Sequence, residues 1–349
     1  MEAIIPAVDP VLLKAELTPD KKLQDTNKGG NEIYIIDAFN SPETMREIGR
    51  LREICFRAEG GCSGKSMDID EFDLMEKPYR QMIVWDPEMK IIAGGYRFIL
   101  GSDVVLDEKG QPKLSSAHLF RFSDEFVKDY LPYTMELGRS FVSPDYQSSK
   151  AGSKSIYILD NLWDGIGGIY MQNKNIIYTF GKPTFHPSYD ASCYALIDAF
   201  LKKHCGGKQG LITPYELRET GLDEKIAGLI LDEEDFNADM RKLKLAVRKL
   251  GANLPPLVNS YAGIAPTLSY FGGAYNDELQ NATEIGILVC FNEMVPDKRD
   301  RHMEPYIAHI AEKIKKRFPR AVDNVTQWAS EKKWGSKDKL YHLFKRKKK

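Results

Sequence analysis

Apolar residues follow first a strand-like and then a helix-like spacing where ordered structure is predicted to begin. Residues 32–36 (EIYII) are rich in β-branched and aromatic side chains, which favours a strand. Ser41 and Pro42 then supply a capping residue and a proline suited to the first helical position. Apolar side chains keep helical spacing from there to Gly60, at Met45, Ile48, Leu51 and Cys55.

The next segment alternates between strand and helix patterns. Residues 79–85 and 91–100 read as two strands joined by a short turn, which predicts a hairpin. The elements predicted after it are a helix over 122–130, a strand over 134–142, a loop over 143–153, a helix over 154–172, a strand over 176–181 and a helix over 189–205. An antiparallel half therefore leads into a parallel crossover, and the fold class is α/β, with a mixed central sheet flanked by helices.

The pattern is sparser beyond residue 205. It predicts a helix over 241–250, a buried strand over 284–291, and an amphipathic helix over 305–318 with Pro305 in its first turn. Because this half lacks a strand-rich core of its own, we predict that it extends the same domain.

The predicted organisation has three parts. Residues 1–31 are polar, end in a glycine-rich stretch and read as a flexible leader. A single domain is expected over 32–320, with a core at 32–205 and an extension at 206–320. Residues 321–349 read as a basic C-terminal tail that ends in Lys345–Lys349.

Composition narrows the function classes. The chain of 349 residues is 42% hydrophobic, with Lys+Arg 49 against Asp+Glu 50, and this balance argues against a nucleic-acid partner. No stretch approaches the roughly 20 apolar residues of a membrane span. The five cysteines have no C-x-x-C spacing and no export signal precedes them, so a cytoplasmic protein is expected. The histidines form no metal pattern, since His302 and His309 are too far apart to share an ion.

The first candidate for chemistry is the predicted strand over 134–142. Side chains alternate along a strand, so Glu136 and Arg139 would face opposite ways unless a bulge lies between them. Gly138 suits such a bulge, which would bring both to one face. A carboxylate there could accept a proton from an attacking ammonium. The alternative is a surface ion pair on an edge strand.

The loop that follows is a candidate anion site, because it precedes a predicted helix start. Its small and basic residues would suit the phosphate of a phosphopantetheine arm; they are Ser148, Ser149, Lys150, Gly152 and Lys154. No Walker A or G-x-G-x-x-G pattern is present. The alternative is an ordinary polar loop.

An acidic cluster lies between the first helix and the hairpin. Residues 68–73 (DIDEFD) could bind a cationic amine, or Arg52 or Arg97. They lack the glycine and terminal glutamate of an EF-hand loop. A solvated acidic turn is the alternative.

The order of these residues is more specific than any one of them. Arg52 and Phe56, then Asp70-x-x-Asp73, Arg97, and Glu136-x-x-Arg139 resemble the pattern of acyl-homoserine-lactone synthases, which are GNAT-fold enzymes that use acyl carrier protein. The chain departs from them at Cys62, where that family has Trp.

A closer resemblance is to the N-acyl amino acid synthase group, which includes ornithine-lipid-type acyltransferases and relatives labelled "putative hemolysin". It rests on the strings ELGRSFVSPDYQ, LDNLWDGIGGIY and LPPLVNSY and on residues 281–289, and it covers roughly 32–310. Gln147 stands where the group often has Arg.

This resemblance implies a GNAT-like fold and an enzyme that joins a fatty acyl group to the amine of glycine or ornithine. The donor would be a phosphopantetheine thioester, acyl-acyl-carrier protein or acyl-CoA, with no permanently bound cofactor. Glu136 would be the base, Ser140 a proton donor to the leaving thiolate, and N–H groups of Phe141 or Val142 would polarise the carbonyl. Arg139 and Arg97 would hold the amino-acid carboxylate or order the acidic cluster. The remaining substrate-binding residues implied are Arg52, Phe56, Asp70, Asp73 and Trp163.

Two partners and two rival functions complete the expectations. An acidic acyl carrier protein would dock on Lys150, Lys154 and the C-terminal lysines, or the tail would hold the enzyme at an anionic membrane leaflet. The first rival is an acetyl-CoA-dependent N-acetyltransferase of the same fold. The second is a non-enzymatic lipid-binding or lytic protein.

Overall fold

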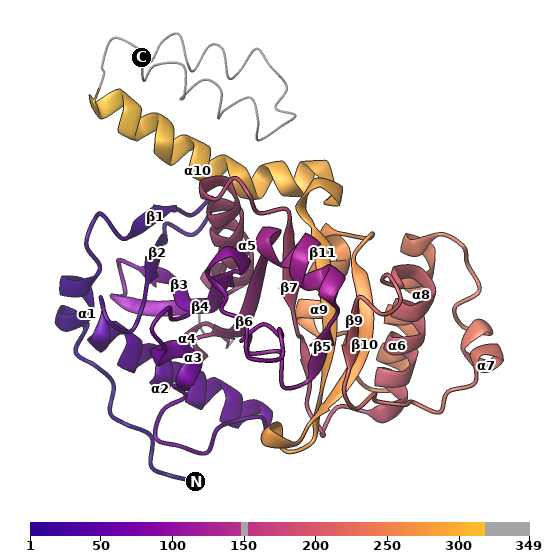
Figure 1. Cartoon of the computed structure of the whole chain (residues 1–349). Helices are drawn as coiled ribbons and strands as arrows, with labels where there is room; N and C mark the ends of the chain where they lie inside the picture. Colours follow the sequence, from indigo (N-terminus) through magenta and orange to yellow (C-terminus); the bar gives the residue numbers. More distant parts are fainter. Residues whose placement is uncertain (148–152, 318–349) are drawn as a thin grey trace.

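The computed structural model describes residues 1–147 and 153–317. Its centre is a nine-stranded sheet in the order β1-β2-β3-β4-β6-β7-β11-β10, with β8 also paired to β11 (Figure 1). The strands of this sheet are β1 (Lys22–Asp25), β2 (Glu32–Ile36), β3 (Arg80–Asp86), β4 (Ile91–Leu100), β6 (Thr134–Val142), β7 (Tyr178–Gly181), β8 (Thr184–Phe185), β10 (Ser269–Asn276) and β11 (Ala282–Cys290). A separate two-stranded sheet joins β5 (Phe120–Phe122) and β9 (Ile212–Pro214).

The helices have the following bounds: α1 (Pro10–Glu16), α2 (Pro42–Glu59), α3 (Glu71–Leu74), α4 (Pro144–Gln147), α5 (Ser153–Gln172), α6 (Ala191–Cys205), α7 (Glu224–Gly228), α8 (Phe236–Lys249), α9 (Pro256–Ile264) and α10 (Pro296–Arg317). A five-residue π-helix lies over Phe126–Tyr130. Within the described residues, no helix has both the length and the apolar character needed to cross a bilayer.

The sheet is antiparallel except where β6 and β7 pair in parallel, on either side of α5. That parallel pairing is short: it runs from Thr134 opposite Tyr178 to Leu137 opposite Gly181. Strand β6 continues to Val142 along its other neighbour, β4. One edge of β6 is therefore unpaired with β7 from Gly138 onward, in the middle of the sheet.

The two faces of the sheet pack into different apolar cores. Met82 and Val84 of β3 pack in the core that contains the inward side of α5. Ile83 and Trp85 pack in the core that contains the inward side of α2. This alternation follows the two-residue repeat of a strand, and it places α5 and α2 on opposite faces. Helix α10 packs on α5 and β1, outside the first face (Figure 1).

Most sequence predictions of local structure are confirmed. The strand over 32–36 and the strand over 134–142 have the predicted bounds. Helix α2 begins at Pro42 behind Ser41 and ends at Gly60, which adopts a left-handed φ of 84°. The hairpin of β3 and β4 and the crossover through α5 are also present. Strand β11 of the C-terminal half joins the central sheet.

The predicted loose leader is wrong. Residues 1–31 contain α1 and the sheet strand β1, and Leu13, Leu17 and Leu23 are buried. The apolar positions are few but each reaches a core that the rest of the chain builds. Burial of about 1.5–3 kcal/mol per large side chain explains why a polar segment is held in place.

Two helix starts were also predicted wrongly. Helix α10 begins at Pro296, so Pro305 lies inside it rather than in its first turn. Phe122 belongs to β5, and helical structure follows only after Ser123. In both cases packing against a neighbouring element outweighed the local signal.

Helices α5 and α10 approach closely at Gly167. A Cβ built on Gly167 would lie 2.8 Å from the carbonyl carbon of His302 in α10, closer than real Cβ atoms come to such a group. We expect Gly167→Ala to lower the free energy of unfolding by about 1–3 kcal/mol, because the two backbones must move apart. Urea denaturation measures the change. Gly228→Ala is the matched control, since nothing lies within 4 Å of its added methyl; equal stabilities would contradict the close approach.

Candidate active site

A cavity of about 970 Å³ opens where β6 and β7 separate. Leu137, Gly138, Arg139 and Ser140 line it from β6, and Lys182, the residue after β7, lines it from the other side. Backbone N–H groups on the unpaired edge of β6 can donate hydrogen bonds to a molecule bound here. This position at an opening in the middle of the sheet makes the cavity the candidate active site.

Strand β6 bulges at the cavity. Gly138 lies opposite Arg97 and Phe141 opposite Gly95, so Arg139 and Ser140 together face Tyr96. Arg139 has a φ of 48°, in the left-handed region that non-glycine residues rarely adopt. The predicted bulge beside Gly138 is therefore confirmed, and it turns the Arg139 guanidinium toward the acidic segment before α3.

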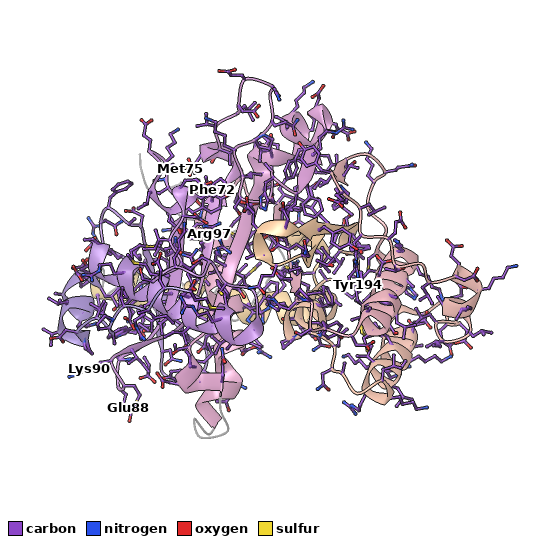
Figure 2. All side chains as sticks on the ribbon, turned by 90° about the horizontal axis from the view of Figure 1, so that it is seen from below. Phe72, Met75, Glu88, Lys90, Arg97 and Tyr194 are labelled. Atoms are coloured by element: carbon purple, nitrogen blue, oxygen red, sulfur yellow. The ribbon has the colours of Figure 1, made fainter. Side chains whose placement is uncertain are left out.

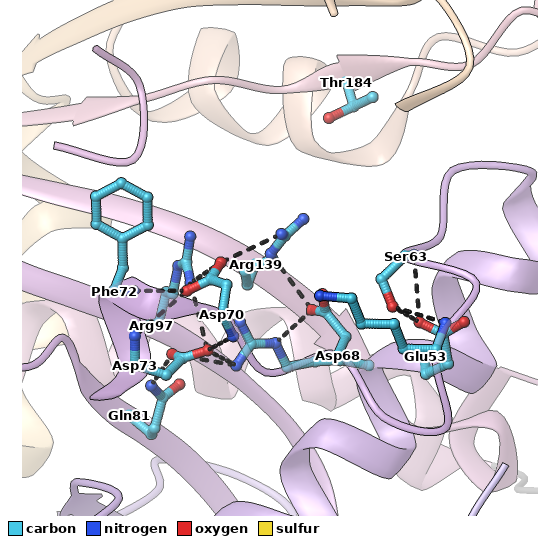
Figure 3. A network of polar contacts seen from close by, with 12 residues as sticks. Glu53, Ser63, Asp68, Asp70, Phe72, Asp73, Gln81, Arg97, Arg139 and Thr184 are labelled. Atoms are coloured by element: carbon cyan, nitrogen blue, oxygen red, sulfur yellow. Dashed lines mark hydrogen bonds and ion pairs between the residues drawn. The ribbon is translucent and has the colours of Figure 1, made fainter. Parts of the chain in front are cut away.

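Three arginines and three aspartates form a charge-balanced network on one wall (Figure 3). Each guanidinium contacts two carboxylates, and each carboxylate contacts two guanidinium groups. The pairs are Arg52–Asp68 at 3.0 Å, Arg52–Asp73 at 3.4 Å, Arg97–Asp70 at 2.6 Å, Arg97–Asp73 at 3.5 Å, Arg139–Asp68 at 3.3 Å and Arg139–Asp70 at 3.3 Å. The solvated acidic turn and the surface ion pair weighed for these residues are both wrong.

Local capping holds the acidic side of this network in place. Asp70 is the N-cap of α3, and it forms a capping box with Asp73. Burial raises the pKa of Asp70, but the charges of Arg97 and Arg139 lower it more, so its net pKa is well below the ordinary value. The Asp70 carboxylate is thus charged at neutral pH.

The network members differ in their access to the cavity. Arg52 and Asp73 are fully buried and do not line it, whereas Asp70, Arg97 and Arg139 do. The Arg97 guanidinium lies 5.6 Å from the Phe72 ring centroid, and both side chains lie in the same part of the molecule in Figure 2. Arg52 and Asp73 therefore act on a substrate only through their neighbours.

Two predicted aromatic contacts fall on different sides of the cavity wall. Phe56 lines the cavity, and its ring lies 5.9 Å from the Arg139 guanidinium. Trp163 lies behind the wall: its indole N–H donates to Ser260 at 2.6 Å and its ring packs edge-on against Tyr261, which does line the cavity. Trp163 thus supports Tyr261 rather than touching the cavity.

Glu136 lies just beneath the cavity surface and is 2% exposed. Its carboxylate accepts hydrogen bonds from the Tyr79 hydroxyl, from the Ser116 hydroxyl and N–H, and from Ser115 Oγ at 3.3 Å. Burial and the Glu136 charge raise the pKa of Tyr79 well above its usual value, which keeps that hydroxyl protonated. Ser115 lines the cavity and so connects Glu136 to it.

Ser140 belongs to a second set of hydrogen-bonded side chains at the bulge, together with Tyr96 and Tyr261. The Tyr96 hydroxyl shares hydrogen bonds with Ser140 and with Tyr261 of α9. Burial raises the pKa values of both tyrosines, so both remain proton donors at neutral pH. Three hydroxyl groups therefore meet where β6 leaves β7.

The remaining predicted residues are placed as follows. Phe141 and Val142 continue β6 beyond the cavity and do not line it, so the accessible N–H groups belong to the preceding residues of the bulge. Ser148, Ser149, Lys150 and Gly152 lie outside the described residues, as do the lysines of the C-terminal tail. Lys154 belongs to the first turn of α5, and its side chain is also outside the description.

Sequence reasoning missed the partners of Glu136 and the wall opposite the network. Tyr79, Ser115 and Ser116 carry no motif, and they reach Glu136 across 57, 21 and 20 residues. Lys182, Thr184, Glu284 and Asn276 line the opposite wall; Figure 3 shows Thr184 across from the network. No local signal could have found either group, because each is assembled by strand order.

One protein family and several known proteins are similar to this chain. Residues 51–154 match the acetyltransferase (GNAT) domain family. The chain is 50% identical over 315 residues to a glycine N(alpha)-acyltransferase of Phocaeicola vulgatus, covering 90% of this chain and 97% of that protein. It is 52% identical over 309 residues to a glycine N(alpha)-acyltransferase of Bacteroides thetaiotaomicron, covering 88% and 91%. Among solved structures, it matches a CoA-dependent acyl-homoserine lactone synthase, BjaI, with a TM-score of 0.37 and 11% identity, over 79% of this chain and 90% of that one.

Proposed function

This chain belongs to the GNAT-fold N-acyl amino acid synthase group and is an N-acyltransferase, and from this we propose that it transfers a fatty acyl group from a thioester to the α-amine of glycine. The observation that carries the proposal is the similarity to two glycine N(alpha)-acyltransferases. About half of the aligned residues are identical, and the alignments cover about nine-tenths of this chain. The non-enzymatic lipid-binding or lytic alternative is wrong for a member of this group.

The proposed reaction needs positioning and proton transfer, because a thioester carbonyl is already activated. The ammonium of glycine loses one proton to a base, and the free amine attacks the carbonyl carbon. As the C–N bond forms and the C–S bond breaks, the second N–H proton passes to the sulfur. The products are the N-acylglycine, the free thiol and one released proton.

Residues at the bulge of β6 suit these steps. We assign the base to Glu136, with Ser115 Oγ relaying the proton from the cavity. Backbone N–H groups between Gly138 and Val142 would stabilise the oxyanion, and those nearest the cavity are best placed for this. Ser140, hydrogen-bonded to Tyr96, would return a proton to the thiolate. The arginine–aspartate network holds the bulge in shape.

The donor and its docking follow from the same scheme. We propose an acyl-acyl-carrier protein, with acyl-CoA as the alternative donor, and a fatty rather than an acetyl group. The phosphate of either donor would bind at Ser148–Lys154, and an acidic carrier would pair with Lys150, Lys154 and the C-terminal lysines. The alternative is that those lysines contact an anionic membrane surface. Weaker binding to anionic vesicles by a variant without the tail than by the full chain would support it.

Mass spectrometry of the purified protein's products tests this function. Glycine or ornithine is supplied with acyl-acyl-carrier protein, long-chain acyl-CoA or acetyl-CoA. We expect N-acylglycine from a long-chain donor. An N-acetylated product alone would support the acetyltransferase alternative. Acylornithine without acylglycine would show that ornithine, and not glycine, is the acceptor. No product from any pair would contradict the proposal.

A further inference from the structure

The cavity wall opposite the arginine–aspartate network contains a second, smaller polar group, here termed the Lys182 cluster (Lys182, Thr184, Asn276 and Glu284). It joins the segment after β7 to the ends of β10 and β11. The Glu284 carboxylate accepts from Lys182 Nζ at 2.6 Å, from Thr184 Oγ1 at 3.0 Å and from Asn276 Nδ2 at 2.8 Å. All four residues line the cavity.

The charges of this cluster are held away from solvent. The side chains of Lys182 and Glu284 are 13% and 3% exposed. Burial raises the pKa of Glu284, but the Lys182 charge and the hydrogen bonds lower it by more. The net pKa is below the ordinary value, so the carboxylate is ionised at neutral pH. An ion pair buried in a wall offers a fold little or no net stability, because desolvation offsets the attraction. The pair is therefore better explained by what it binds.

One atom of the cluster lacks a partner. Asn276 is 2% exposed, and its Oδ1 has no hydrogen bond among residues 1–147 and 153–317. The amide orientation is fixed, because Nδ2 donates to Glu284. A buried acceptor without a donor is unfavourable. A ligand N–H in the cavity would satisfy it.

The location is the one an acceptor needs. Lys182 follows Gly181, the last β7 residue that pairs with β6, and Gly138 is the first β6 residue beyond that pairing. The Lys182 cluster and the β6 bulge are thus the two sides of the same opening. A molecule held by Lys182 faces the edge of β6 at which we place the thioester.

We propose that the Lys182 cluster binds the acceptor amino acid as a zwitterion. Lys182 pairs with its α-carboxylate, Asn276 Oδ1 accepts a hydrogen bond from its α-ammonium, and Glu284 holds both residues in position. The inference rests on the proposed function and names the acceptor subsite within it. A site with one cation and one hydrogen-bond acceptor without a partner matches a ligand that carries a carboxylate and an ammonium group.

This assignment differs from a carboxylate bound by Arg97 or Arg139. Both carboxylates that Arg97 contacts, and both that Arg139 contacts, belong to the protein itself. An incoming carboxylate would have to displace them. Lys182 Nζ donates to Glu284 at 2.6 Å, and an ammonium group has two further N–H donors with which it can bind a ligand.

Steady-state kinetics with varied glycine and saturating acyl donor test the subsite. Lys182→Met removes the cation, and the double variant Lys182→Met/Glu284→Gln removes it without leaving a buried charge. We expect KM for glycine to rise about 10- to 100-fold in both, with KM for the donor little changed. Lys22→Met is the matched control, since Lys22 also forms a largely buried ion pair, with Glu32 at 2.6 Å, but neither residue lines the cavity, so KM for glycine should not change. Thermal unfolding establishes that each variant is folded.

Three results would overturn the inference. An unchanged KM for glycine in the folded double variant removes Lys182 from acceptor binding, while wild-type turnover keeps the proposed function. A rise confined to the KM of the donor assigns Lys182 to the phosphate of the donor. If the wild type does not acylate glycine, saturation-transfer NMR of glycine tests binding directly. A wild-type signal that is lost in the double variant would support the subsite although the proposed function fails. No signal with the wild type would overturn both.

Discussion

The Glu136→Gln enzyme is expected to fold like the wild type and to lose turnover by about 10²- to 10⁴-fold, the usual contribution of a general base. Glutamine has the shape of glutamate but cannot accept a proton. Its amide oxygen can still accept from the Ser116 N–H, which lies 3.1 Å from the carboxylate, and the Tyr79 and Ser115 hydroxyls can rotate. Product formation at saturating substrates measures kcat, and circular dichroism establishes folding.

Glu53→Gln is the matched control for this substitution. Glu53 is also fully buried and accepts from a serine hydroxyl, Ser63 Oγ at 2.7 Å, and from the N–H of Gly64 at 3.1 Å. It does not line the cavity, so turnover should change little. Wild-type turnover in Glu136→Gln would remove Glu136 from the mechanism. Equal losses in both variants would indicate a general effect of the missing charge.

Arg97→Met should lower the free energy of unfolding by about 3–5 kcal/mol, because three largely buried carboxylates then share only two guanidinium groups and one negative charge is left uncompensated. Arg97 is 3% exposed in its side chain and pairs with Asp70 at 2.6 Å and with Asp73 at 3.5 Å. Urea denaturation at pH 7 measures the change. The loss should shrink at acid pH: Arg97 lowers the pKa of Asp70 in the fold, so the stability it supplies is present above the ordinary carboxyl pKa and is lost as pH falls below it.

An exposed pair provides the comparison for Arg97. Lys208 pairs with Glu125 at 2.5 Å, and the two side chains are 58% and 41% exposed. Lys208→Met should change the free energy of unfolding far less than Arg97→Met does, because solvent screens the pair. If the two substitutions have equal effects, the network does not stabilise the fold, and its role is confined to the cavity.

The sequence by itself determined the elements whose signals are local. Helix α2 was bounded by Ser41–Pro42 and Gly60, since capping and left-handed φ depend on adjacent residues. Strand β6 and its bulge were predictable because alternation broken by one glycine is a short-range pattern. For the acidic cluster the sequence left several partners open, including Arg52 and Arg97, and the structure shows that both contact it.

Only the tertiary structure decided how the cavity is built. Lys182 meets Glu284 across 102 residues, Tyr79 meets Glu136 across 57, and Arg139 meets Asp70 across 69. Strand β1 and helix α1 belong to the fold because other segments supply the cores that cover Leu13 and Leu23. Periodicity fixes which face of a strand is buried, but it carries no information about which strand lies beside it. The pairing of β6 with β7 ends early and thereby opens the cavity, and strand order and packing determine where it ends.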